Sequence, residues 1–178
     1  MRAMRRLPLL LLAPLALPVA AVAVAQEPVS ALKGHNSDAP IDLTADRLEV
    51  QERADRAMFS GNVKVKQDEL TLDTSRLTVA YSSSSGVQIK RLDASGGVTV
   101  RSPSETARGT FGIYDLDRKL ITLVGNVVLK REGSQIAGQR LVIDLDSGRA
   151  VIDGGPAGVG QRGGRVTGHF TVPQRRGS

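Results

Sequence analysis

The strongest constraint on the fold is an alternation of apolar and polar residues with a period of two, which begins just after Pro40. In Ala57-Met-Phe-Ser-Gly-Asn-Val-Lys-Val65, each odd position is apolar or glycine. Successive side chains of a strand point to opposite faces, so this spacing puts the apolar residues on one face. The spacing recurs in short segments separated by turn residues, and no window outside the N-terminal run has a convincing helical period. The pattern therefore predicts an all-β domain of stacked antiparallel strands. The segments are Ile41/Leu43, Leu48/Val50, Leu70/Leu72, Leu77/Val79, Val87/Ile89, Val98/Val100, Leu123/Val127/Leu129 and Leu141/Ile143/Leu145.

One of these strands is written twice. Phe59-Ser-Gly-Asn-Val-Lys-Val65 returns 64 residues later as Leu123-Val-Gly-Asn-Val-Val-Leu129, and Arg76-Leu77 returns as Arg140-Leu141. A weaker copy, Gly96-Gly-Val-Thr-Val100, lies between them. Recurrence without gaps indicates repeated β-units, each of which buries one face against its neighbours.

The Gly-Asn pair inside the repeat has two interpretations. A two-residue hairpin turn would pair Phe59 with Lys64 and mix apolar with polar residues on each face. If the strand continues instead, Phe59, Gly61 and Val63 share a face, and the glycine marks a bend or bulge. We favour the bend because it keeps the alternation intact.

The N-terminus indicates export. Met1-Arg-Ala-Met-Arg-Arg6 is basic, residues 7–24 are apolar, and Ala23-Val-Ala25 is a small-x-small cleavage site. We predict a cleaved signal peptide over 1–25, a flexible lead-in over 26–39, the β-domain over 40–173 and a disordered tail over 174–178. A retained membrane anchor is the alternative, although three prolines interrupt the apolar run. No cysteine follows the run, which excludes a lipoprotein anchor and any disulfide framework.

The net charge of +6 does not indicate a nucleic-acid partner. Seven of the 24 basic residues lie within 1–25 or 156–178, whereas all 18 acidic residues lie between these ends, so residues 26–155 carry a net charge of −1. Aromatic residues make up only 3% of the chain, too few for a base-stacking platform. The basic tail, Arg162 to Arg176, has two interpretations: a contact with phosphates or a membrane surface, or a soluble disordered end.

No residues form a recognisable catalytic motif. His35 and His169 lack partners at any known motif spacing, and the glycine-rich segments match neither a dinucleotide fingerprint nor a P-loop. The pairs Asp115/Asp117 and Asp144/Asp146 have the chemistry to bind a hard cation, but they run into turn residues and are better interpreted as solvated turn acids. We therefore expect neither enzyme activity nor a cofactor or metal.

Three features together resemble the OstA-like family: the segment Pro40-Ile-Asp-Leu-Thr-Ala-Asp-Arg47, the Phe/Leu-x-Gly-Asn-Val strands and the Arg-Leu-x-Val/Ile strands. The resemblance covers about residues 40–173, with Arg165-Val-Thr-Gly-His-Phe-Thr-Val-Pro173 similar to a terminal strand. It implies an open, V-shaped β-jellyroll around an apolar groove. It further implies a periplasmic protein that binds lipopolysaccharide acyl chains and carries them from the inner to the outer membrane. Its implied partners are inner- and outer-membrane components of that machinery and further copies of itself, joined head to tail.

The physics of lipid transfer is consistent with that picture. Each methylene exposed to water costs about 0.8 kcal/mol, so a lipid with many chains needs shelter in an aqueous compartment. Unpaired sheet edges are usually an aggregation risk, but here strand addition would continue the groove into the next copy.

The resemblance places four side chains in the acyl groove by motif match: Ile41, Val100, Tyr114 and Leu116. The inward phase of the strands adds a second set on the same face. These are Leu43, Val50, Phe59, Val63, Val79, Leu123 and Val127. Any of these residues has the alternative role of plain core.

Two rival hypotheses remain. A membrane-anchored relative in the same pathway would retain residues 7–24, so the mature N-terminus distinguishes it. A structural β-repeat protein would have a closed dry core and bind no lipid.

Overall fold

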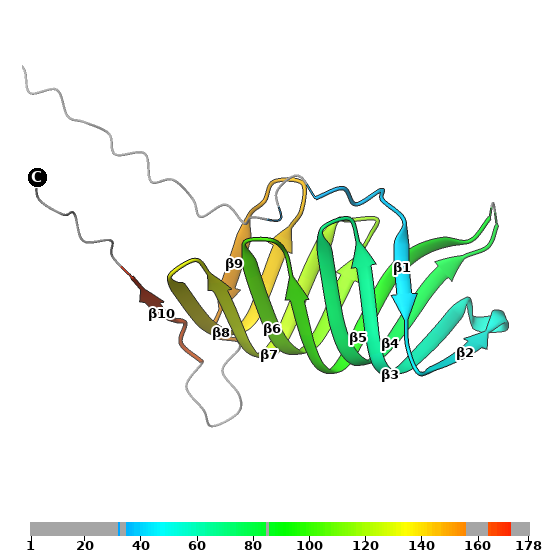
Figure 1. The fold of residues 1–178 in the computed structure, drawn as a ribbon, viewed down its shortest axis with the longest axis horizontal. Helices are drawn as coiled ribbons and strands as arrows, with labels where there is room; N and C mark the ends of the chain where they lie inside the picture. The colour runs from blue at the N-terminus through cyan, green and yellow to red at the C-terminus, as the bar shows by residue number, and fades with distance from the viewer. Residues whose placement is uncertain (1–31, 33–34, 85, 156–163, 172–178) are drawn as a thin grey trace, which may run out of the picture.

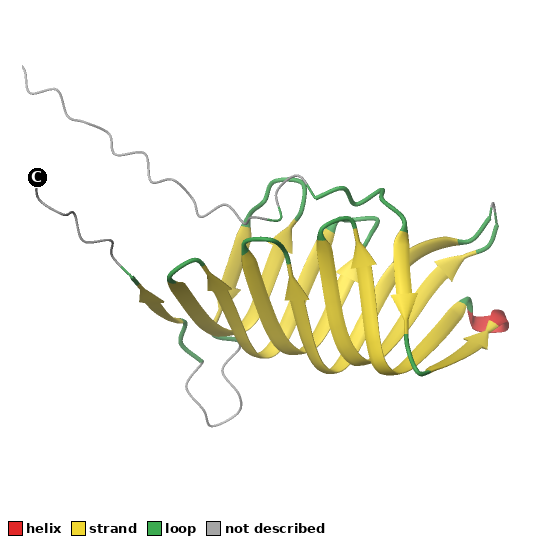
Figure 2. Ribbon diagram, in the orientation of Figure 1, coloured by secondary structure: helices red, strands yellow, loops and turns green. Residues whose placement is uncertain are grey.

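The computed structural model describes residues 32, 35–84, 86–155 and 164–171, which form a ten-stranded antiparallel sheet (Figure 1). Six long strands make up its centre, and two short strands flank each end (Figure 2). The long strands are β3 (Arg56–Gln67), β4 (Leu70–Ser82), β5 (Gln88–Arg101), β6 (Glu105–Asp115), β7 (Leu120–Arg131) and β8 (Ser134–Asp144). The short strands are β1 (Ile41–Thr44), β2 (Arg47–Gln51), β9 (Ala150–Asp153) and β10 (Thr167–Phe170).

Helix is almost absent from the described residues, where a single 3-10 turn at Glu52–Ala54 follows β2. Within the same residues, no helix is long and apolar enough to cross a membrane. The predicted signal peptide over 1–25 and the predicted tail over 174–178 lie outside the described residues. Strand β10 falls inside the segment 165–173 that resembles a terminal strand.

Each long strand bends in its middle, and the bends divide the sheet into two arms. Between β3 and β4, Ser60 pairs with Arg76 and Val63 pairs with Thr74, so two residues of β3 oppose one of β4. Equivalent register shifts interrupt the other ladders of the long strands. Arm A contains β1, one half of each long strand and β10, whereas arm B contains β2, the other halves and β9. The all-β, open V-shaped jellyroll is confirmed, as is the bend at Gly-Asn.

The repeated residues are the bends themselves. Gly61 and Gly125 have φ values of 77° and 82°, and the asparagines that follow them are also at positive φ. The weaker copy, Gly96-Gly97, has φ values of 84° and 87°. Glycine adopts this left-handed region without the steric cost that a Cβ brings. The repeat thus bends alternate strands, β3, β5 and β7, at the base of the V.

The core lies between the two arms. Leu77, Leu123 and Leu141 are 0% exposed and come from three strands of arm B. Valines and leucines of arm A, such as Val63 and Leu72, complete the same cluster. Burying each of these side chains contributes about 1.5–3 kcal/mol, and this burial holds the arms together in a chain without cysteine.

Candidate functional site

The predicted groove residues gather on the inner faces of the two arms. Cross-strand pairs extend the inner face of arm B from Val50 through Ala57, Val79 and Leu92 to Tyr114. In arm A, Leu43 pairs with Val65, which continues through Leu72 to Val100. Of the rest, Ile41, Phe59, Val63, Leu123 and Val127 share this inner phase, and Leu116 packs against the core just after β6.

The inner face is closed in its middle and open toward β1 and β2. Six predicted residues are at most 3% exposed: Val63, Val79, Val100, Tyr114, Leu123 and Val127. Four are partly buried: Ile41, Leu43, Phe59 and Leu116.

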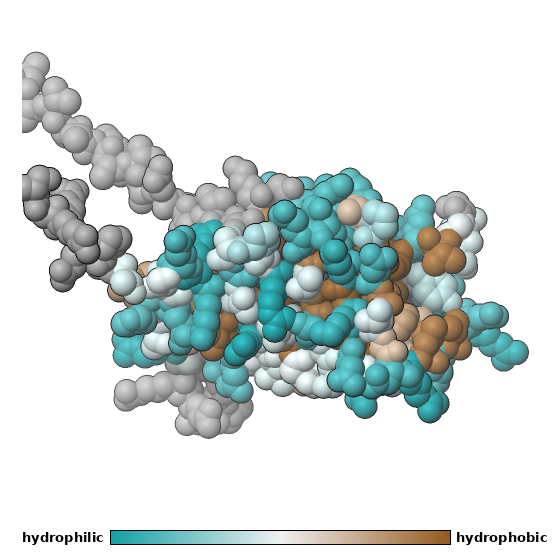
Figure 3. Space-filling view, in the orientation of Figure 1, coloured by the Kyte–Doolittle hydropathy of each residue, from teal (hydrophilic) through white to brown (hydrophobic). Residues whose placement is uncertain are grey.

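Strand β2 forms the open end. Val50 is 53% exposed, and Leu48, which sequence reasoning left out of the site, is 54% exposed. Leu48 pairs with Phe59 and so continues the inner face to the edge of arm B. In Figure 3, hydrophobic residues gather at the β2 end, and a hydrophobic strip continues along the middle of this face. Monomers rarely expose a continuous apolar surface that has no partner.

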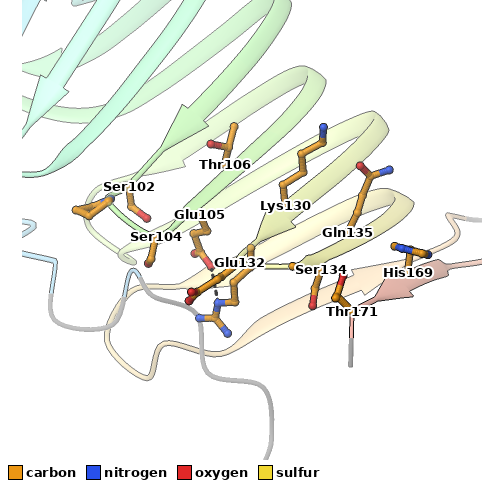
Figure 4. A pocket seen from close by; sticks show the side chains of 13 residues that line it. Ser102, Ser104, Glu105, Thr106, Lys130, Glu132, Ser134, Gln135, His169 and Thr171 are labelled. Atoms are coloured by element: carbon orange, nitrogen blue, oxygen red, sulfur yellow. Dashed lines mark ion pairs between the residues drawn. The ribbon is translucent and has the colours of Figure 1, made fainter. Parts of the chain in front are cut away.

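The opposite end of the sheet is polar along one rim. A pocket of about 510 Å³ lies between the β5–β6 turn, the β7–β8 turn and β10 (Figure 4). In it, Arg131 Nε lies 3.5 Å from Glu105 Oε2, and His169 of β10 is on the lining. Three apolar side chains are exposed near this end: Val151 of β9 at 40%, Val166 at 44% and Phe170 at 61%.

A buried polar residue that sequence reasoning missed joins the two arms. Gln67, at the end of β3 in arm A, is 1% exposed. Its Oε1 accepts a hydrogen bond of 2.9 Å from the hydroxyl of Tyr114 in arm B. The signal was present in the sequence, because Val63, Val65 and Gln67 continue one phase and so place an amide on an apolar face.

Part of the segment expected to be a flexible lead-in over 26–39 also contributes contacts here, namely residues 32 and 35–39; the rest of it lies outside the described residues. Leu32 is 4% exposed and belongs to the core cluster. The Gln67 amide donates to the backbone carbonyls of Ser37 and Ala39, both at 2.9 Å. His35 Nε2 lies 3.1 Å from Gln67 Oε1. An absence of periodicity in the sequence carries no information about such single contacts.

Charged groups lie mainly outside the V and at the turns. Burial raises the pKa of the Tyr114 hydroxyl, which therefore stays protonated and able to donate. On the outer face, partial burial alone would raise the pKa of Asp73, but hydrogen bonds from Lys64 and Arg101 outweigh it and lower that pKa. Apart from Glu105, which is 6% exposed and pairs with Arg131 at the polar rim, the interior therefore offers apolar surface and neutral hydrogen-bonding groups.

The two aspartate pairs considered as cation ligands, Asp115/Asp117 and Asp144/Asp146, are engaged in turn hydrogen bonds and ion pairs. Asp115 accepts from the backbone of Arg118 and Asp144 from the backbones of Asp146 and Ser147. Asp117 pairs with Lys90, and Asp146 pairs with Lys119. No group of three or more His, Cys, Asp or Glu side chains suited to a metal ion occurs among the residues that the structure describes.

Comparison with known proteins gives three results. Residues 42–149 match the family described as "LptA/(LptD N-terminal domain) LPS transport protein". An uncharacterized protein of Rhizobium meliloti (strain 1021) is 33% identical over 144 residues, which cover 76% of this chain and 77% of that protein. The crystal structure of LptH from Pseudomonas aeruginosa, described as the LptA homologous periplasmic component of the conserved lipopolysaccharide transport device, matches with a TM-score of 0.65. That match has 16% sequence identity and covers 78% of this chain and 99% of LptH.

Proposed function

The chain belongs to the LptA/LptD N-terminal-domain family of LPS transport proteins, and from this premise we propose that it shelters lipopolysaccharide acyl chains between its two arms. In this proposal the protein works in the periplasm, after removal of residues 1–25. It passes lipid from inner-membrane to outer-membrane components of the transport machinery. The role is that of a binding conduit, with no catalytic step.

The observation that carries the proposal is the continuous apolar inner face, which is open at β2. Leu48 and Val50 of β2 are half exposed. Further along the same rows of cross-strand pairs, Phe59 of β3 is partly buried and Val79 of β4 is fully buried. Acyl chains that enter at β2 and slide between the arms would exchange water for hydrocarbon at about 0.8 kcal/mol for each methylene. Parting of the arms would widen the space, because the bends at the base of the V leave their outer rims free of a covalent link.

Self-assembly through the ends of the sheet would lengthen the groove. Among the residues that the structure describes, arm A ends in β1 and β10 and arm B ends in β2 and β9, so each arm has an unpaired edge at both ends. Exposed apolar side chains stand at both ends, Leu48 and Val50 at one and Phe170 at the other. We propose that β-strand addition joins the β1/β2 end of one copy to the β9/β10 end of the next.

Site-specific photocrosslinking to lipopolysaccharide tests the groove. The crosslinking residue is placed at Phe59, which faces inward and is partly buried, and in a matched variant at its outward neighbour Met58. A second matched pair is Tyr114 and Ile113 on β6. We expect crosslinks at Phe59 and Tyr114, at least about tenfold above those at Met58 and Ile113.

Equal or absent crosslinking within both pairs, in folded protein, would contradict the conduit and favour the structural β-repeat protein. Mass spectrometry of the exported protein decides between the conduit and the membrane-anchored relative. A mature chain that starts at Gln26 supports the former, and retention of residues 7–24 supports the latter.

A further inference from the structure

Gln67 is the most deeply buried polar side chain among the described residues. A buried amide without partners costs about 1–3 kcal/mol, so such a residue in an apolar interior needs a reason. The hydrogen bonds of Gln67 give that reason. Its two N–H donors reach the carbonyls of Ser37 and Ala39, and its oxygen faces Tyr114 and His35. All four positions of the amide are therefore occupied.

These contacts lie at the rim of the V, away from the bends. Gln67 ends β3 in arm A, and Tyr114 is the residue before the end of β6 in arm B. Residues 35–39 therefore pass along the strand ends and contact the Gln67 amide. The same amide binds Tyr114 of the opposite arm. In Figure 1 the segment before β1 follows this edge of the sheet. Leu32 at its start is buried in the core between the arms.

The groups that Leu32 and residues 35–39 place here resemble the head of a lipid acyl chain. An apolar side chain enters the core, and two carbonyl oxygens nearby accept hydrogen bonds from one amide. An ester- or amide-linked acyl chain has the same combination, an apolar tail with a carbonyl at its head. A hydroxyl on such a chain could in addition donate to the Gln67 oxygen. A chain that displaced the segment could thus restore the hydrogen bonds that Gln67 would otherwise lose.

We propose that Gln67 and Tyr114 form a polar subsite for the carbonyl and hydroxyl groups at the head of a lipid acyl chain, and that Leu32 and residues 35–39 fill this subsite in the lipid-free protein. The inference rests on the proposed lipid-binding function. It adds a chemical preference to the groove: chains with a polar head group at the rim bind more tightly than plain alkyl chains. It also makes the N-terminal segment a competitor of the lipid.

The lack of native cysteine allows a direct test of the competition. In a Leu32→Cys variant of the full mature chain, the thiol is buried and reacts slowly with a water-soluble maleimide. Saturation with lipid A should speed this labelling by about tenfold or more, because lipid expels the segment. A Val98→Cys variant is the matched control, because Val98 is 2% exposed and lies next to the bend of β5. Labelling of the thiol at position 98 should stay slow in saturating lipid A. Labelling at position 32 that is unchanged or slower in saturating lipid A would overturn the proposal.

A pair of synthetic lipids tests the chemical preference. One glucosamine lipid carries amide-linked 3-hydroxyacyl chains, and the other carries ether-linked alkyl chains of equal length. We expect the native protein to prefer the first by about tenfold, the effect of one or two hydrogen bonds. Gln67→Leu should remove the preference, whereas the same substitution at the exposed Gln135 should retain it.

The outcomes separate the two proposals. If the native protein binds neither lipid nor lipid A, the proposed function is wrong. If it binds both lipids equally while the thiol at position 32 stays protected, the conduit stands and the subsite is wrong. Should Gln67→Leu fail to fold, the native protein's preference and the labelling at position 32 still decide the question.

Discussion

At the scale of single residues, the V is shaped by backbone conformation as much as by burial. Gly125 lies at φ 82° on β7, and a Cβ built there would stand 2.8 Å from Thr110 Oγ1 on β6. Thr110 Oγ1 also lies 3.2 Å from the Gly125 carbonyl oxygen and donates to it. Gly97 has a similar φ of 87°, but nothing lies within 4 Å of its Cβ position. Substituting Gly97 therefore measures the conformational cost of a Cβ at positive φ alone, whereas substituting Gly125 adds the steric cost of the contact with Thr110.

We expect Gly97→Ala to lower the free energy of unfolding by about 1–2 kcal/mol, the cost of a left-handed residue with a Cβ. Gly125→Ala should cost more, about 2–4 kcal/mol, because Thr110 must also move. Urea unfolding of both variants measures the difference. Equal losses would show that the contact with Thr110 is accommodated without cost.

The ion pairs around Asp73 predict a pH dependence. Lys64 Nζ lies 2.9 Å from Asp73 Oδ1, and Arg101 binds the other oxygen. In the folded state these partners hold the pKa of the Asp73 carboxyl below its ordinary value of 3.8. The contribution to stability is therefore complete above pH 3.8 and is lost as the pH falls from there through the lowered pKa of the folded state.

Asp73→Asn should reduce stability at pH 7 by up to about 1 kcal/mol, since the group is partly exposed. Thermal unfolding at pH 7 and at pH 2 measures this effect, and the native protein and the variant should converge at the lower pH. The difference at pH 7 should also shrink in 1 M salt. A difference that persisted at pH 2 would point to packing instead of charge.

At the scale of the strands, sequence and structure agree best where the pattern repeats. The alternation predicted segments of every long strand except β6. The consistency of the faces decided between hairpin and bend at Gly61-Asn62, because only a bend keeps Phe59 and Val63 on one side. The same alternation placed Val50 on the inner face but could not predict that it is exposed. Its exposure follows from the position of β2 at the end of arm B, which the alternation does not encode. Gln67 was missed because the alternation was applied only to apolar residues. Contacts of residues 35–39 depend on which segments meet in space, which no local pattern encodes.

The strands differ in how much stability they carry, and this difference is measurable. Leu141 of β8 is 0% exposed, so Leu141→Ala should cost about 2–5 kcal/mol. The side chains of β10 are all exposed, so ending the chain after Gly155 should cost less than about 1 kcal/mol. Chemical denaturation of the two variants provides the comparison. A large loss on truncation would mean that β10 supports the folding of β8.

At the scale of the whole molecule, the end-to-end assembly proposed above has a predictable geometry. The β2 end exposes Leu48 and Val50, and the β10 end exposes Phe170, so an end-to-end contact is heterologous. A heterologous contact that does not close into a ring continues as a linear filament. Association should therefore depend on concentration and leave the width of the particle unchanged.

Sedimentation velocity combined with small-angle scattering tests the linear assembly. We expect species of growing length and constant cross-section, and we expect Leu48→Asp or Phe170→Asp to weaken association at least about tenfold. Val124→Asp is the control, because Val124 is 41% exposed but lies on the interior strand β7, in the outward phase of arm B. Equal weakening by Val124→Asp would place the contact on the outer face of arm B.

The bends of β3, β5 and β7 have a consequence for how proteins of this kind change in size. Each bend brings two positive-φ residues opposite one residue of the neighbouring strand, so the geometric unit is a pair of strands. Duplicating or deleting one such pair would change the length of the trough by about 10 Å, twice the spacing between strands, and leave its profile the same. The gene can thus vary the molecule's length in steps without redesigning its cross-section.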